Sequence, residues 1–293
     1  MYTYEEFKQT MTKLLQEKAG DNAEVNFTEI IQNNGKKQEG VMVWTPDRNI
    51  EPIILLPELY TGYRAGESLS GCMDKVIRKA TCEEYGFNPV VPRDWAEIKG
   101  KIKPYLLNYQ WNEEKLADMP YRKFLDLAVV LRCHLQETET RRVSLDVTKR
   151  MLDYWGITED ELWSAAENNL RKEKFQIWDV NEILRGFSME TEQTKKLRGK
   201  QYVMSNLDRY LGAAGLIRTD LLMEFAKEKG CGFYILPSSL HELIFMPDRG
   251  IYQAEALKEM VCSVNQEMVL QEEWLSDKVY YFSPETEKVK CLY

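Results

Sequence analysis

The chain has 293 residues, of which 44% are hydrophobic and 29% are charged. This is the balance of a folded protein with one large core or two modest ones. Its formal net charge of −8 repels phosphate backbones, which argues against nucleic acid as the main partner. No apolar run approaches the ~20 residues that a membrane helix needs, so we expect no membrane partner.

The six cysteines are dispersed and none has C-x-x-C spacing, a pattern that indicates reduced thiols rather than a disulfide framework. The N-terminus has no basic start followed by an apolar block, and is therefore not read as a secretory signal. We expect a cytoplasmic protein.

In the first third of the chain, residues 4–18 carry an apolar stripe and predict a helix. Residues 25–31 and 39–44 predict a hairpin, because Asn34 and Gly35 between them suit the positive φ of a tight turn. A second amphipathic helix is expected over residues 68–84.

In the middle third, residues 105–109 predict a strand, and residues 124–135 predict one long uninterrupted strand. A helix over 146–155 should end at Gly156. Thr158 and Glu161 have the spacing of a capping box and predict the start of the next helix.

The last third predicts two helices and five strands. The helices are expected over residues 216–229 and 254–268, and the strands over 201–205, 278–282, 288–292 and the two arms of a hairpin within 232–247. The fold class is therefore α+β, with mixed, largely antiparallel sheets built from hairpins with packed amphipathic helices. We expect an N-terminal region over residues 1–100 and a C-terminal region over 101–293, with a possible linker at 186–200.

The hairpin turn from Pro237 to Glu242 contains the side chains of a nucleophilic site. An imidazole at His241, a hydroxyl at Ser239 and the Glu242 carboxylate are the minimum for activating a nucleophile. However, Ser239 and His241 lie about 7 Å apart in an extended strand, and the chain has no G-x-S-x-G elbow. The alternative is that the hydroxyls satisfy backbone groups of the turn.

Asp126 is a fourth candidate catalytic residue, because it lies within the most apolar predicted strand, where an unpaired charge is costly. A structural ion pair or hydrogen bond is the alternative, and Arg122 or Arg93 could supply the partner.

A zinc site is disfavoured. His241-Glu242 begins an H-E-x-x pattern, but residue 245 is Phe245 and not the second histidine. Because no loop has calcium or magnesium ligand spacing either, we expect no metal and no cofactor.

Three residues are candidates for ligand binding: Ser238, Asn206 and Gly212. Gly212 lies in a small-residue run before a helix, where backbone N–H groups can face an anion. The run lacks the Lys-Ser/Thr ending of a phosphate loop, and close packing of the helix is the alternative.

Several blocks resemble the family labelled domain of unknown function 5688. They are Asn33-Asn34-Gly35 with Gly40, Asn49 to Pro52, Pro120 to Val130, Trp155 to Leu162, Ala166 to Asn169, and Ile235 to Glu242. A fainter likeness is to the YtpQ-like proteins. The resemblance implies a bacterial cytoplasmic protein and carries over no activity.

The leading hypothesis is a non-enzymatic binding or regulatory module that engages a protein or a small ligand. The alternative is a hydrolase in which Ser239, His241, Glu242 and Asp126 converge in a cleft.

Overall fold

A computed structural model describes residues 1–19, 23–44, 52–80, 90–137, 142–180, 201–237 and 239–292. The chain divides into two compact units, each with its own contacts. Unit 1 comprises residues 1–94 and 135–143, and unit 2 comprises residues 95–134 and 144–293. The predicted linker at 186–200 lies outside the described residues. None of the described helices has the length and apolar character to cross a membrane.

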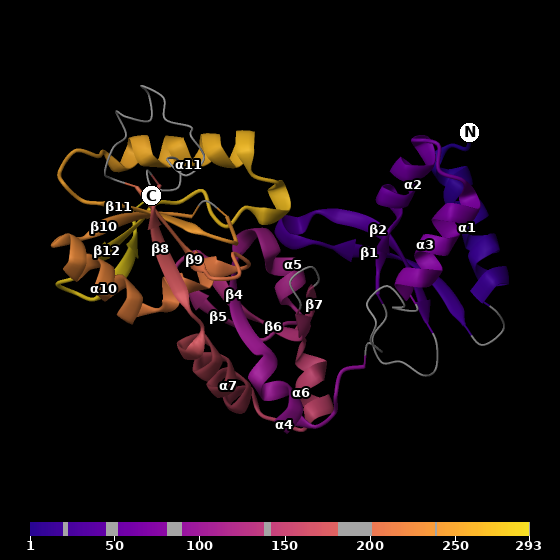
Figure 1. Ribbon diagram of the computed structural model, residues 1–293, viewed down its shortest axis with the longest axis horizontal. Helices are drawn as coiled ribbons and strands as arrows, with labels where there is room; N and C mark the ends of the chain where they lie inside the picture. Colours follow the sequence, from indigo (N-terminus) through magenta and orange to yellow (C-terminus); the bar gives the residue numbers. More distant parts are fainter. Residues whose placement is uncertain are drawn as a thin grey trace. The chain divides into compact units, whose positions relative to one another are not determined.

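Unit 1 packs helices on a small antiparallel sheet (Figure 1). Its elements are α1 (Tyr4–Ala19), β1 (Glu24–Ile31), β2 (Lys37–Trp44), β3 (Ile54–Leu55), α2 (Leu56–Arg64) and α3 (Leu69–Ala80), with strand order β1-β2-β3. Phe7, Met11 and Leu15 recur at helical spacing on α1 and are fully buried. They share one core with Val41 and Val43, which alternate on β2. This core confirms the predicted first helix and hairpin.

The turn between β1 and β2 follows its prediction. Asn34 and Gly35 both have positive φ, of 59° and 70°. Asparagine and glycine adopt this conformation at low cost, so the turn fixes the register in which Ile31 pairs with Lys37.

Unit 2 contains two antiparallel sheets. The elements that lie wholly or mostly in its first half are α4 (Trp95–Ile98), β4 (Ile102–Asn108), α5 (Glu113–Leu116), β5 (Tyr121–Phe124), β6 (Leu127–Glu137), β7 (Arg142–Asp146), α6 (Lys149–Trp155) and α7 (Glu159–Lys172). The first sheet has the order β4-β6-β5, and β7 also pairs with β6. At the start of α7 the capping box is present as predicted, because the Glu161 N–H donates to Thr158 Oγ1 and the Thr158 N–H donates to the Glu161 carboxylate.

The second sheet has six strands in the order β13-β12-β10-β11-β9-β8. The remaining elements are β8 (Phe175–Asp179), β9 (Tyr202–Asn206), the 3₁₀ helix η5 (Gly212–Ile217), α10 (Thr219–Lys229), β10 (Phe233–Leu236), β11 (Leu243–Pro247), α11 (Ala254–Met268), the 3₁₀ helix η6 (Gln271–Glu273), β12 (Tyr280–Ser283) and β13 (Lys288–Cys291). All pairs along this order are antiparallel. The predicted α+β class is therefore confirmed.

Helices cover both faces of the six-stranded sheet (Figure 1). On one face, Leu236 and Met246 share a cluster with Leu257 and Val261 of α11. On the other face, Phe225 of α10 packs against aromatic rings from β10 and β11, with ring centroids 4.9 and 5.3 Å away. Since side chains alternate across a strand, this burial of both faces explains why β10 and β11 are apolar at nearly every position.

The prediction of one uninterrupted strand over residues 124–135 is wrong. β5 ends at Phe124, and Leu125 and Asp126 turn the chain directly into β6, so that Phe124 pairs with Leu127. Leu125 has φ of 58° and is 40% exposed, an unusual combination for a leucine. The alternating apolar pattern does not reveal this reversal. Two-residue hairpin turns usually have Gly or Asn where φ is positive, and this position is a leucine.

Leu125→Asn should raise the free energy of unfolding by about 0.5–1 kcal/mol, because the left-handed region is costly for leucine and tolerated by asparagine. Urea unfolding of the variant and the parent measures the difference. An unchanged or lower midpoint would mean that Leu125 contributes packing that outweighs its backbone strain.

Candidate functional site

The hairpin turn between β10 and β11 is held by its own polar groups. The His241 backbone N–H donates to Ser239 Oγ (3.0 Å), and the Ser239 N–H donates to the Glu242 carbonyl (3.4 Å). Ser205 of β9 donates its hydroxyl to the His241 carbonyl (2.6 Å). Ser239 is 7% exposed. Its hydroxyl therefore acts as a turn cap, the structural reading of this motif. Ser238 lies outside the described residues.

The His241 ring is held from three sides. The Leu211 backbone N–H donates to Nδ1 (3.1 Å), and Nε2 lies 3.5 Å from a Glu273 carboxylate oxygen. The ring stacks on Tyr210, with centroids 5.4 Å apart. Because Nδ1 accepts a hydrogen bond, the proton of the neutral ring lies on Nε2, facing Glu273.

Asp126 has different partners from those suggested by the sequence. The Ser276 and Tyr280 hydroxyls each donate to its carboxylate at 2.7 Å. Ser276 and Tyr280 are both fully buried. Within the described part of the chain, Arg122 pairs instead with Glu167. Burial and the nearby Asp126 charge hold the pKa of Tyr280 well above its usual range, so this hydroxyl stays a donor.

Asp126 therefore joins the β5–β6 turn to the six-stranded sheet, and the described contacts of Ser239 and His241 lead to other groups. The convergence of these residues in a catalytic cleft stays a prediction that these contacts do not favour.

Two of the ligand-binding candidates are engaged in packing. Asn206 is 4% exposed; its amide donates to Glu173 (2.9 Å) and the Tyr210 carbonyl (2.8 Å), and its oxygen accepts from the Tyr210 N–H (3.0 Å). At Gly212 an added Cβ would lie 2.6 Å from the Asn206 nitrogen and 2.6 Å from the His241 carbonyl. The small residue thus permits close approach of η5 to β9, as the packing alternative expects.

A charged cluster around Asp146 is linked to the β10–β11 turn through Tyr210. Asp146 Oδ1 accepts from Arg132 Nε (2.9 Å) and Nη2 (2.7 Å) and from the Tyr105 hydroxyl (2.7 Å), and Oδ2 pairs with Lys115 (2.9 Å). Arg132 also donates to the Tyr210 hydroxyl (2.8 Å). Burial opposes ionisation of Asp146, but Arg132 and Lys115 outweigh it and lower the pKa of Asp146 to about 2.

The described side chains include no group of three or more His, Cys, Asp or Glu arranged to hold a metal ion. The cluster around Asp146 instead satisfies its carboxylate with cations and a hydroxyl, which makes it a structural ion-pair network.

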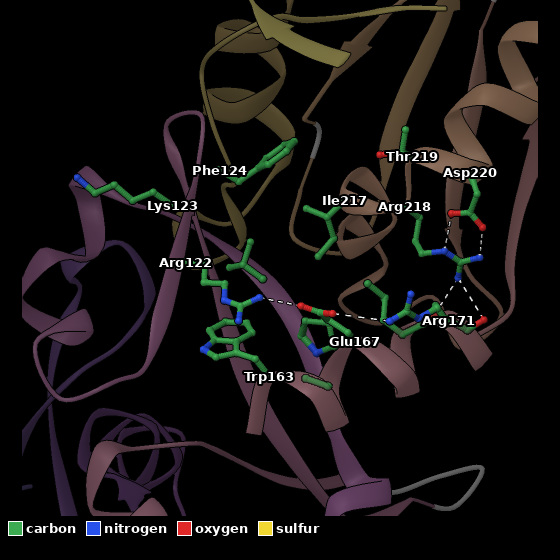
Figure 2. A pocket seen from close by; sticks show the side chains of 14 residues that line it. Arg122, Lys123, Phe124, Trp163, Glu167, Arg171, Ile217, Arg218, Thr219 and Asp220 are labelled. Atoms are coloured by element: carbon green, nitrogen blue, oxygen red, sulfur yellow. Dashed lines mark hydrogen bonds and ion pairs between the residues drawn. The ribbon is translucent and has the colours of Figure 1, made fainter. Parts of the chain in front are cut away.

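A pocket of about 690 Å³ opens elsewhere in unit 2, within the size range of small-molecule sites. Figure 2 shows its lining, which comes from β5, α7 and the η5–α10 junction together with one residue each of β4 and β6. Its apolar lining consists of Pro104, Phe124, Val129, Trp163, Ala166, Leu170 and Ile217. Its basic and acidic residues are Arg122, Lys123, Arg171, Arg218, Glu167 and Asp220.

The Arg218 side chain makes structural hydrogen bonds within unit 2. Its guanidinium makes two bonds to Asp220 (2.8 and 2.6 Å) and donates to the Leu170 carbonyl (2.8 Å) at the end of α7. Only 12% of its side chain is exposed. A cation at a helix C-terminus is favourable, so Arg218 closes α7 and forms one wall of the pocket.

Arg122 and Arg171 share the Glu167 carboxylate on one side of the pocket (Figure 2). Arg122 lies 2.7 Å from one Glu167 oxygen, and Arg171 lies 3.7 Å from the other. The Arg122 guanidinium also stacks over the Trp163 ring, 4.5 Å from its centroid. These contacts place two cations and an aromatic ring on one side of the pocket.

None of the residues that line this pocket was predicted from the sequence to bind a ligand. A signal was present on α7, where Trp163, Glu167 and Arg171 recur every four residues and so share one helix face. No pattern in the sequence shows that Arg122 and Arg218 come to this face, because β5 and η5 reach α7 only through tertiary packing.

The fold and pocket thus define an α+β protein with a small-molecule-sized pocket and no recognised catalytic constellation among its described residues. Residues 4–284 match the model described as "Family of unknown function (DUF5688)", and the chain belongs to this family. No curated protein and no solved structure matches the chain. The likeness to YtpQ-like proteins stays a prediction.

Ser239→Ala should lower the free energy of unfolding by about 1 kcal/mol, because the turn loses the acceptor of the His241 N–H. Ser263→Ala, on the exposed face of α11, is the matched control and should change stability by less than about 0.5 kcal/mol. Denaturant unfolding compares them. Equal stability of the two variants would contradict the capping role and restore weight to the hydrolase hypothesis.

Asp146→Asn should lower the free energy of unfolding by about 3 kcal/mol at neutral pH, because Arg132 and Lys115 lose their partner. The pKa of Asp146 is depressed from 3.8 to about 2, so its stabilisation is fully present above about pH 4 and disappears as the pH falls through 2. The difference between variant and parent should shrink over this window.

The exposed Asp153→Asn serves as the control and should follow the parent at every pH. Thermal unfolding from pH 7 to pH 2 measures all three proteins. A gap between the parent and Asp146→Asn that stays constant with pH would show that the Asp146 charge contributes nothing.

Proposed function

We propose that this protein is a non-enzymatic binding module that holds a small molecule in the unit 2 pocket. The pocket itself carries this proposal: about 690 Å³ of space lined by seven apolar and six charged side chains. This is the composition of sites that bury a ligand body in apolar surroundings and orient it with polar contacts.

The non-enzymatic part of the proposal is supported by what the candidate catalytic groups already do. Ser239 caps the turn, His241 accepts from the Leu211 backbone, and Asp126 accepts from two hydroxyls. A nucleophile and its base need a mutual hydrogen bond, and the described contacts of Ser239 and His241 run instead to the turn and to the Leu211 backbone. A hydrolase would require these contacts to be broken first.

A cytoplasmic location is part of the same proposal, as is the bacterial origin that the family resemblance implies. Cys72 and Cys133 are buried as free thiols, and Cys231 and Cys262 are free thiols as well. Thiols of this kind persist in a reducing compartment.

Ile217→Trp tests the pocket because it fills the space without changing any charge. The probe is N-phenyl-1-naphthylamine, an uncharged dye that fluoresces in apolar surroundings. The parent should bind it saturably, and Ile217→Trp should weaken binding at least about tenfold, because the indole occupies the ligand volume.

Ile251→Trp is the matched control, since Ile251 is 52% exposed and lies outside the pocket lining. It should bind the dye within about twofold of the parent. Thermal melting confirms that both variants are folded. No saturable binding by the parent, or equal binding by the two variants, would contradict the proposed site.

A further inference from the structure

The charges of the pocket are opposite in sign to those of the whole protein. The chain carries a formal net charge of −8, whereas four basic and two acidic side chains line this pocket. Asp220 is bound to Arg218 by two hydrogen bonds, so this pair contributes little net field. The remaining excess of positive charge belongs to Arg122, Arg171 and Lys123.

Lys123 contributes least to the interior. Its ammonium lies over the Tyr109 ring, 3.6 Å from the centroid, and Figure 2 shows the side chain directed away from Glu167. The local charge is therefore set by Arg122 and Arg171 against the single Glu167 carboxylate.

The Arg122 guanidinium is preorganised to bind an anion. Its guanidinium lies on the Trp163 ring, and Trp163 is itself fixed because its indole N–H donates to Glu159 (3.0 Å). A guanidinium carries five N–H donors in a fixed fork that matches carboxylate and phosphate oxygens. Stacking restricts its motion, so little conformational freedom is lost on binding.

In the structure, the anion that pairs with Arg122 and Arg171 is the carboxylate of Glu167. Its two oxygens point to Arg122 (2.7 Å) and Arg171 (3.7 Å), and half of its side chain is exposed. Ion pairs as exposed as this one are weak, so a ligand anion can join or replace this carboxylate at small cost.

We propose that the ligand of this pocket is a small amphipathic anion. Its carboxylate or phosphate binds Arg122 and Arg171 beside Glu167, and its flat apolar body lies against the apolar lining that includes Phe124 and Ile217. This inference rests on the proposed function and adds the chemical class of the ligand to it. Glu167 acts as an internal competitor that sets the affinity.

Two dyes that differ by one charged group test the proposal: 8-anilino-1-naphthalenesulfonate, an anion, and N-phenyl-1-naphthylamine, its uncharged counterpart. Arg122→Gln should weaken binding of the sulfonate about tenfold, because a charge-assisted contact is lost, and leave the uncharged dye within about twofold. Glu167→Gln should tighten the sulfonate several-fold. Both effects should diminish in 0.5 M salt, which screens partly exposed charges.

Arg150→Gln is the matched control, because it removes the same charge from an exposed position on α6. It should change neither affinity by more than about twofold. Thermal melting checks that Arg122→Gln is folded, and Glu167→Gln gives an independent test with the opposite sign. Equal responses of the two dyes to these pocket variants would overturn the anion inference.

Ile217→Trp separates the two proposals. If Ile217→Trp loses both dyes, but Arg122→Gln and Glu167→Gln affect the two dyes equally, the binding site is kept and the anion is rejected. Retention of both dyes would reject the site itself. We expect 2-naphthoate and 2-naphthyl phosphate to displace the sulfonate at lower concentrations than the uncharged 2-naphthol, and the acid that displaces at the lowest concentration identifies the head group. Equal displacement by 2-naphthol would contradict the inference.

Discussion

The Arg132–Asp146 pair is the interaction on which the interior of unit 2 depends. It combines two short hydrogen bonds with a third from Tyr105 and an ion pair with Lys115, so one carboxylate ties together β4, α5, β6 and β7. Arg132 then reaches Tyr210, whose ring stacks on His241 in the β10–β11 turn. Both side chains are about one fifth exposed, and removing one partner of a largely buried ion pair is strongly destabilising. These contacts link the first sheet of unit 2 to the β10–β11 turn of the second sheet.

The candidate catalytic side chains of the sequence make structural contacts in this arrangement. A hydroxyl, an imidazole and a carboxylate are useful in catalysis because they form strong hydrogen bonds, and the same property makes them effective at fixing turns. Here Ser239 and His241 satisfy backbone N–H groups, and Asp126 satisfies two buried hydroxyls. Their chemistry is used to join loops to sheets.

The pocket arises from a different use of charge. Arg218 closes the C-terminal end of α7 through the Leu170 carbonyl, and in doing so it places η5 and the start of α10 opposite β5. The walls are thus supplied by β5, by α7 and by the junction of η5 with α10. Arg122 and Glu167 face this space and are half exposed. They make fewer of the described structural hydrogen bonds than Arg218 does.

The sequence by itself determined the elements that local physics controls. Apolar periodicity placed α1, α11 and most strands, Asn34-Gly35 placed a turn, and Thr158 with Glu161 placed the start of α7, because each signal acts within a few residues. The turn at Leu125 and Asp126 was invisible, since tertiary contacts of Asp126 hold a leucine in a conformation that it rarely adopts. Only the tertiary structure decided the partners of Asp126 and His241 and the meeting of Arg122 with α7. Those contacts join residues 30 to more than 150 positions apart, and no local pattern encodes such distances.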